Sequence, residues 1–179
     1  MNLKELDGKP IILDGGMGQE LVARSTKELT ALWATMILLQ EPELVESVHK
    51  DYFDVGADVA TTNTYATHRD RLKVFDLEDK FEQLMVAGCE IACRARDKHG
   101  SGTIAGSLGP NARSYRPDLV LGIDEGAEIY AEIARIQAPF VDVLLLETMV
   151  SLDQATGALM GAASVNKPVW LSVSVSDED

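Results

Sequence analysis

The sequence has few cysteines, few basic residues and no long apolar run, and each shortage excludes a class of protein. Two cysteines in 179 residues do not make a disulfide framework, so we expect reduced thiols and a cytoplasmic location. Sixteen basic residues against 29 acidic ones give a net charge of -13, which argues against nucleic acid or an anionic membrane surface as a partner. The longest apolar runs are too short to span a bilayer.

The sequence does have short β-rich runs that alternate with longer segments of helical spacing. The spacing of apolar residues predicts helices from Pro42 to about Gly56, over 81–96, over 124–137, and after the capping pair Ser151 and Gln154. The β-rich runs predict five strands, over residues 10–13, 58–62, 102–107, 141–146 and 168–175. These strands are too far apart for hairpins, so we expect an α/β fold with a parallel sheet and helical crossovers.

The order of these elements fits two architectures in a single domain over residues 1–179. A doubly wound open sheet of five strands would be complete at this length. A (β/α)8 barrel would be incomplete, because about 250 residues is typical of that fold. The strand spacing alone does not distinguish them.

Small, hydroxyl and acidic residues follow the predicted strands, at the end where both architectures bind ligands. Turns favour the same residue types, so one such loop means little, whereas agreement among all the loops indicates a site. The residues, in strand order, are Asp14, Gly15 and Gly16; Thr62, Thr64 and Tyr65; Ser107; Glu147; and Ser172, Ser174 and Ser176.

Two carboxylates, Asp14 and Glu147, give the strongest chemical indication. Two acids at the carboxyl-terminal end of the strands, which we call the mouth, favour a cationic group, such as a substrate ammonium, or a metal ion. Gly15 and Gly16 would let a ligand carboxylate reach backbone N–H groups, and DGGMGQEL has no lysine or arginine to hold a phosphate. Together these groups favour an amino acid zwitterion. The alternative is that Asp14 caps a local turn and Glu147 pairs with an arginine.

The two cysteines, Cys89 and Cys93, share one face of a predicted helix. With His99 nearby, a zinc site is conceivable. Both thiols lie in an apolar stripe with Met85, however, and buried core thiols are the interpretation that we favour. We expect His49 to be a packing or surface residue, and His68 is a weak candidate for the mouth.

Several segments resemble the homocysteine S-methyltransferase family, in the same order and over almost the whole chain: DGGMGQEL, LWAT, EPELVESVHKDYFDVGADVATTNTYAT, AGSLGP, VDVLLLET and PVWLSVSV. The resemblance implies a partial (β/α)8 TIM barrel, with about five of its eight strands in this chain. It implies methyl transfer from a sulfonium donor such as S-methylmethionine to the thiol of homocysteine, which forms methionine. It also implies that the substrate is bound by Asp14, Gly15, Gly16, Thr62, Thr64, Tyr65 and Glu147.

The resemblance further implies a zinc ion that binds the homocysteine thiol as a thiolate, the nucleophilic form. In the family three cysteines hold this zinc, one after the sixth strand and an adjacent pair near the end of the barrel. This sequence contains none of those positions, and Cys89 and Cys93 do not match them. We therefore assign no metal ligand and no catalytic residue, and expect the chain alone to bind little zinc and to lack methyl-transfer activity.

Other interpretations remain open at this point. An open sheet leaves unpaired edges, so a homo-oligomer is possible. A non-catalytic remnant that binds an amino acid or a partner protein is the main alternative function. An unrelated barrel lyase or aldolase, with Asp14 and Glu147 as acid and base, is another. No lysine that could form a Schiff base is evident at the end of a predicted strand, although Lys167 precedes the fifth.

Overall fold

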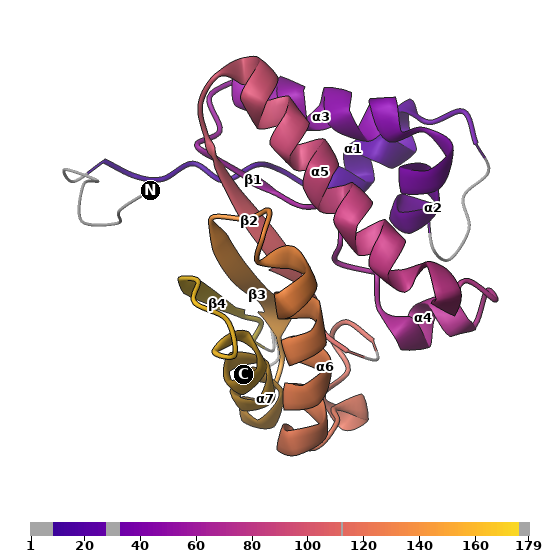
Figure 1. Cartoon of the computed structure of the whole chain (residues 1–179), viewed down its shortest axis with the longest axis vertical. Helices are drawn as coiled ribbons and strands as arrows, with labels where there is room; N and C mark the ends of the chain where they lie inside the picture. The colour runs from indigo at the N-terminus through magenta and orange to yellow at the C-terminus, as the bar shows by residue number, and fades with distance from the viewer. Residues whose placement is uncertain (1–8, 28–32, 112, 176–179) are drawn as a thin grey trace.

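The computed structural model describes residues 9–27, 33–111 and 113–175, and its four strands form one parallel sheet in the order β1-β2-β3-β4 (Figure 1). The predicted parallel sheet with helical crossovers is therefore confirmed. The described elements are α1 (Met17–Arg24), α2 (Trp33–Gln40), α3 (Pro42–Asp54), β1 (Val59–Thr61), α4 (Arg69–Lys73), η2 (Glu78–Lys80), α5 (Phe81–His99), β2 (Thr103–Leu108), η3 (Pro117–Leu119), α6 (Ile123–Gln137), β3 (Val143–Met149), α7 (Leu152–Ala162) and β4 (Val169–Val173).

Residues 10–13, predicted as the first strand, join the sheet through a single bridge. Leu13 pairs with Val59 in parallel, and the Asp14 N–H donates to the Val59 carbonyl over 2.9 Å. The prediction of a full strand here is wrong in extent. The neighbouring strand β1 has only three residues, so it offers few groups for a longer ladder.

The helix boundaries differ from the predicted ones for local reasons. α6 begins at Ile123 with Gly122 as its N-cap, so Asp124 lies in the first turn and does not cap the helix. α5 continues beyond residue 96 and ends at Gly100, whose φ of 91° is easy for glycine. Ser151 caps α7, as its capping sequence predicts. α1, α2 and α4 were not predicted; α4 is short, and α2 is apolar nearly all round, which hides a helical period.

The two faces of the sheet have different partners. Outward side chains such as Ala60, Ile104 and Leu144 belong to the main core beneath the helices, which cover this face (Figure 1). The inward side chains form a second, smaller cluster made of Val59, Ala105, Val143 and Leu145, with Ile11 and Trp170 packed against it. The inner face is thus apolar toward the strands' amino ends, which leaves their carboxyl ends for polar residues.

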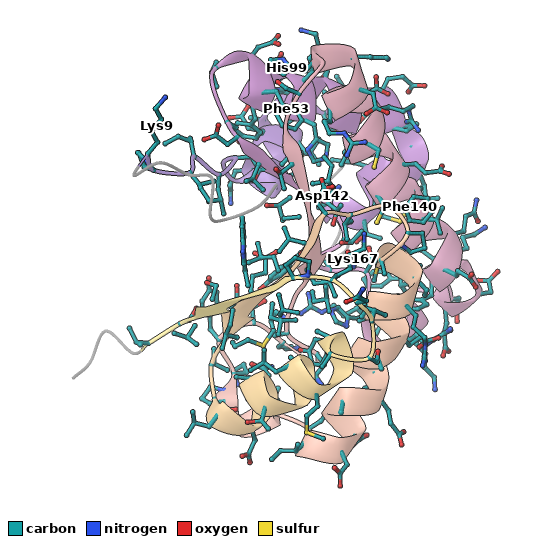
Figure 2. All side chains as sticks on the ribbon, turned by 60° about the vertical axis from the view of Figure 1, so that its left-hand side comes forward. Lys9, Phe53, His99, Phe140, Asp142 and Lys167 are labelled. Atoms are coloured by element: carbon teal, nitrogen blue, oxygen red, sulfur yellow. The ribbon has the colours of Figure 1, made fainter. Side chains whose placement is uncertain are left out.

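Polar side chains just before β1, β3 and β4 bond to the backbone of the neighbouring segment nearer the N-terminus. The Asp58 N–H donates to the Ile12 carbonyl over 2.7 Å, and Asp58 Oδ2 accepts the Ile12 N–H over 2.9 Å. Asp142 repeats this double contact with Ile104, over 2.9 and 2.8 Å. Lys167 donates to the Val141 carbonyl over 2.6 Å, and Figure 2 labels Lys167 and Asp142 in the segments that lead into β4 and β3. These contacts satisfy backbone groups that the ladder leaves unpaired.

The open edge at β4 exposes apolar side chains. Leu171 is 43% exposed and Val173 is 61% exposed. Association through this edge remains a prediction. Within the described parts of the chain, no helix is long and apolar enough to cross a membrane.

We predict that Asp142→Ala lowers the free energy of unfolding by about 1–3 kcal/mol, because the buried Ile104 N–H loses its acceptor. Asp142→Asn keeps an acceptor oxygen in the same place and should lose much less. Urea unfolding followed by circular dichroism measures both. Equal losses for the two variants would show that the charge of Asp142, and not its hydrogen bond to Ile104, stabilises the sheet.

Candidate functional site

Asp14 turns its carboxylate toward the end of β1. Oδ2 accepts the Thr61 N–H over 2.7 Å, and Oδ1 accepts the Thr61 hydroxyl over 2.9 Å. The carboxylate thereby completes the ladder at the point where the backbone of the first segment leaves the sheet. Thr61 lies two residues after Val59, so it shares the inner face of the sheet.

Glu147 lies on the same face, at the carboxyl end of β3. Its Oε1 accepts a hydrogen bond from the hydroxyl of Ser107 on β2. The next residue, Thr148, has a φ of 62°, which is a strained conformation for a β-branched residue. The pairing of β3 with β4 shifts register between Leu146 and Met149, and Met149 returns to the outer core. This bulge ends the normal alternation immediately after Glu147.

Burial is the main cause of a raised pKa at both carboxylates. Burial raises the pKa of Asp14 to about 6; hydrogen bonds from Thr61 lower it, and the negative charge of Glu147 adds to the rise. Burial also raises the pKa of Glu147, and the Ser107 hydrogen bond opposes that rise. Neither carboxylate has an arginine or lysine partner among the described contacts. The alternative in which Glu147 pairs with an arginine is therefore not what the structure shows.

The glycines after Asp14 have different surroundings. A Cβ on Gly15 would lie 2.8 Å from the Tyr52 ring and hydroxyl, so the absence of a side chain lets α3 approach this turn. A Cβ on Gly16 would meet only Gln19, at 3.7 Å, so packing does not require glycine there. Gly16 is the N-cap of α1 and has no side chain. No side-chain acceptor therefore caps the first N–H groups of the helix.

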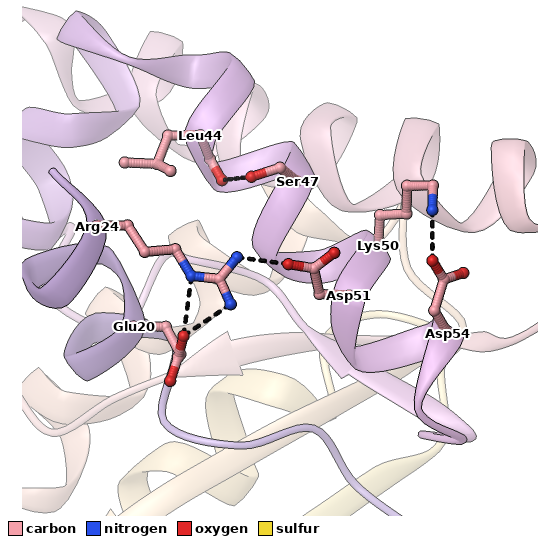
Figure 3. Close-up of polar contacts among 7 residues, drawn as sticks. All are labelled: Glu20, Arg24, Leu44, Ser47, Lys50, Asp51 and Asp54. Atoms are coloured by element: carbon pink, nitrogen blue, oxygen red, sulfur yellow. Dashed lines mark hydrogen bonds and ion pairs between the residues drawn. The ribbon is translucent and has the colours of Figure 1, made fainter.

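Ion pairs hold α1 against α3 beside this turn. Arg24 donates to Glu20 on its own helix over 2.9 Å and to Asp51 on α3 over 2.5 Å (Figure 3). These side chains are partly exposed, so each pair stabilises the fold by less than about 1 kcal/mol. They link the last turn of α1 to α3.

Thr62 and Thr64 are buried and bond to the protein backbone. Their hydroxyls lie 2.8 Å apart, and both contact the backbone of Ser107. The sequence pointed to these threonines, whereas Thr61 is the one that contacts Asp14. Tyr65 is half-buried, and its hydroxyl lies 2.6 Å from that of Ser114. Of the predicted substrate-binding residues, the structure brings Asp14, Gly15 and Gly16 together, with Glu147 close enough to affect Asp14.

The predicted substrate-binding residues did not include Tyr52, or Thr61, which stands at the end of the second predicted strand. Period-2 alternation from the inward Val59 would have indicated Thr61, provided that the inward face had been known. Tyr52 lies in the apolar stripe of α3, where it could not be distinguished from a core residue.

The cysteines and histidines lie away from the carboxylates. Cys89 is buried in the main core, and Cys93 donates to the Phe140 carbonyl over 3.2 Å, so both are structural thiols. His49 and His68 are buried, and burial lowers the pKa of His49 to about 4 and that of His68 to about 3. Among the residues that the structure describes, no three histidine, cysteine, aspartate or glutamate side chains lie together as a metal site would require.

The fold and the mouth define a class of protein: a parallel α/β sheet curved like part of a (β/α)8 barrel, with two carboxylates at its carboxyl end. A family model for homocysteine S-methyltransferases matches residues 11–179, and the chain belongs to that family.

The chain is also similar to characterised relatives and to a solved structure. It is 32% identical to homocysteine S-methyltransferase YbgG of Bacillus subtilis, with 96% of this chain and 61% of the relative aligned. It is 30% identical to homocysteine S-methyltransferase of Escherichia coli, over 94% of this chain and 60% of the relative. The metallated form of the homocysteine methyltransferase MmuM from E. coli superposes with a TM-score of 0.81 at 26% identity, covering 93% of this chain and 64% of that one. The chain therefore spans about three fifths of the length of these relatives.

We predict that Asp14→Asn stabilises the chain at pH 8 by about 1 kcal/mol and changes little at pH 3.5. Because the folded-state pKa of Asp14 is raised from 3.8 to about 6, the parent chain loses stability as pH rises from about 4 to about 6, where the unfolded chain ionises Asp14 and the folded chain does not. Asparagine removes the charge and can still bond to both Thr61 groups. Thermal unfolding at the two pH values measures the difference. A variant less stable at pH 8 than the parent chain would contradict this prediction.

Proposed function

We propose that this protein is a homocysteine S-methyltransferase, and that its mouth holds the amino acid end of homocysteine. The observation that carries the proposal is the pair of half-buried carboxylates, Asp14 and Glu147, without a cationic partner of their own among the described contacts. A substrate ammonium supplies the missing positive charge. It would favour the ionised form of both acids and offset the cost of burying them.

The turn after Asp14 suits the substrate carboxylate. The exposed backbone of Gly15 and Gly16 leads directly into α1, whose first N–H groups have no side-chain cap. An anion is stabilised at such a helix start by the N–H groups and by the helix dipole. Acid and amides thus lie side by side, as the two charged groups of an amino acid require.

The reaction that we propose transfers a methyl group from a sulfonium donor such as S-methylmethionine to the homocysteine thiol. The similar structure of MmuM from E. coli is a metallated form. The described residues of this chain do not fit a metal site, because no cluster of three ligands exists among them and both cysteines are structural. We therefore derive no step through a metal, and the role that we propose for these residues is to bind and orient the substrate.

A second candidate function is amino acid binding without catalysis. It is favoured by the same observation that the described residues hold two carboxylates and no metal cluster. A lysine-dependent aldolase is disfavoured, because Lys167 bonds to the Val141 carbonyl ahead of β3, at the opposite end of the strands from Glu147.

We predict that L-homocysteine binding, measured by isothermal titration calorimetry, weakens at least tenfold in Glu147→Gln, which removes a buried charge facing the ammonium. Glu90→Gln is the matched control, because Glu90 is an exposed residue of α5. Binding to the parent chain should also weaken up to about tenfold from pH 7.5 to pH 5, because Asp14 becomes protonated below its pKa of about 6. Equal affinities for all three proteins would exclude Glu147 as a substrate ligand.

Methyl transfer is tested with S-methylmethionine that carries deuterated methyl groups. Labelled methionine formed from unlabelled homocysteine, detected by mass spectrometry and reduced in Asp14→Asn, would support the methyltransferase. Homocysteine binding without labelled methionine is the result that we expect of the 179-residue chain alone. The same result for the protein purified from its native cells and supplied with zinc would favour the second candidate. Failure of both binding and transfer would refute the proposal.

A further inference from the structure

Ser107 is the point at which the hydrogen bonds of the mouth converge. It is 1% exposed, and both of its backbone groups and its hydroxyl have partners. Its N–H and carbonyl lie beyond the last backbone contact from β1, which is the Thr62 N–H to the Ala105 carbonyl over 2.9 Å. Side chains must therefore satisfy the backbone of Ser107 on that side.

Two threonine hydroxyls do so by forming a closed ring with Ser107. The Ser107 N–H donates to Thr62 Oγ1 over 2.9 Å, and Thr64 Oγ1 donates to the Ser107 carbonyl over 3.0 Å. The single proton of the Thr64 hydroxyl is thereby used, so the 2.8 Å contact between the hydroxyls must have Thr62 as its donor. All three bonds then point the same way round the ring, an arrangement in which each bond polarises the next.

Gln137 of α6 adds further hydrogen bonds to this ring. Its Nε2 donates to the Ser107 carbonyl over 2.8 Å and lies 3.4 Å from Thr64 Oγ1. The side chain fits only because residue 106 is glycine, since a Cβ there would lie 2.4 Å from Gln137 Oε1. Three side chains thus fix the backbone of Ser107. Its remaining group, the hydroxyl, donates to Glu147.

We propose that Ser107 is a positioning residue that holds the Glu147 carboxylate in the orientation that receives the substrate ammonium. This inference rests on the function proposed above and identifies the group through which the fold controls Glu147. Thr148 provides the complementary constraint, because its strained backbone and the bulge leave Glu147 without an ordinary ladder position on its own strand. The hydroxyl of Ser107 supplies the contact that fixes the carboxylate. It also favours the charged form of Glu147, which burial opposes.

The test is a double-mutant cycle on L-homocysteine binding at pH 7.5, with Ser107→Ala, Glu147→Gln and the double variant. We expect Ser107→Ala to weaken binding about tenfold, as for a hydrogen bond to a charged group, and to have no further effect in the Glu147→Gln background. Ser47→Ala is the matched control, because its hydroxyl also donates one bond, to the Leu44 carbonyl over 2.8 Å, but on α3 (Figure 3). Additive losses would overturn the proposal, because Ser107 would then act independently of Glu147.

A second measurement does not depend on the substrate. The Glu147 carboxyl carbon is titrated by NMR in the parent chain and in Ser107→Ala, and its signal is assigned from Glu147→Gln. Loss of the donor should raise the pKa of Glu147 by at least about 0.5. Ser107→Cys, which keeps the side-chain size but donates weakly, gives the same comparison if the alanine variant does not fold. An unchanged pKa would overturn the proposal. A raised pKa in a chain that does not bind homocysteine would refute the proposed function and leave the positioning of Glu147 by Ser107 intact.

Discussion

The structure depends on one constraint, the alternation of side chains along parallel strands. Ala60 belongs to the core beneath the helices, whereas Val59 and Thr61 point inward. The outward residues form the main core with the helices, and the inward residues are not part of that core. Because the inward cluster is apolar only toward the amino ends, the polar residues at the carboxyl ends share one small region and meet there.

Side chains also complete the backbone ladder wherever a strand ends early. Asp14 accepts the Thr61 N–H, Asp142 accepts the Ile104 N–H, and threonine hydroxyls bond to Ser107. Because the strands are short, side-chain hydrogen bonds of this kind satisfy a large share of the strands' backbone groups. At the carboxyl end they have a second effect, because the same groups that satisfy the backbone also orient the acids of the mouth. Stability and binding geometry therefore share the same hydrogen bonds.

The sequence predicted the parallel fold and the helices α3, α5, α6 and α7, because their periodic spacing is a local property. It also placed Asp14 and Glu147 at strand ends. It could not distinguish Thr61 from Thr62, because the face that a strand residue occupies depends on the register of the whole sheet. The bulge at Thr148 was hidden for the same reason. The contacts of Ser107 were not predictable, because its partners Thr62, Gln137 and Glu147 lie 30 or more residues away.

The side-chain contacts made just before β1, β3 and β4 have a consequence for the order in which the sheet assembles. Asp58 holds Ile12, Asp142 holds Ile104, and Lys167 holds Val141, so each reaches back to a segment nearer the N-terminus. Because the chain leaves the ribosome with its N-terminus first, these contacts can form one after another. None of the three needs a strand that is synthesised later. The sheet can therefore add strands one at a time during synthesis, because each new βα unit pairs with an edge that has already formed.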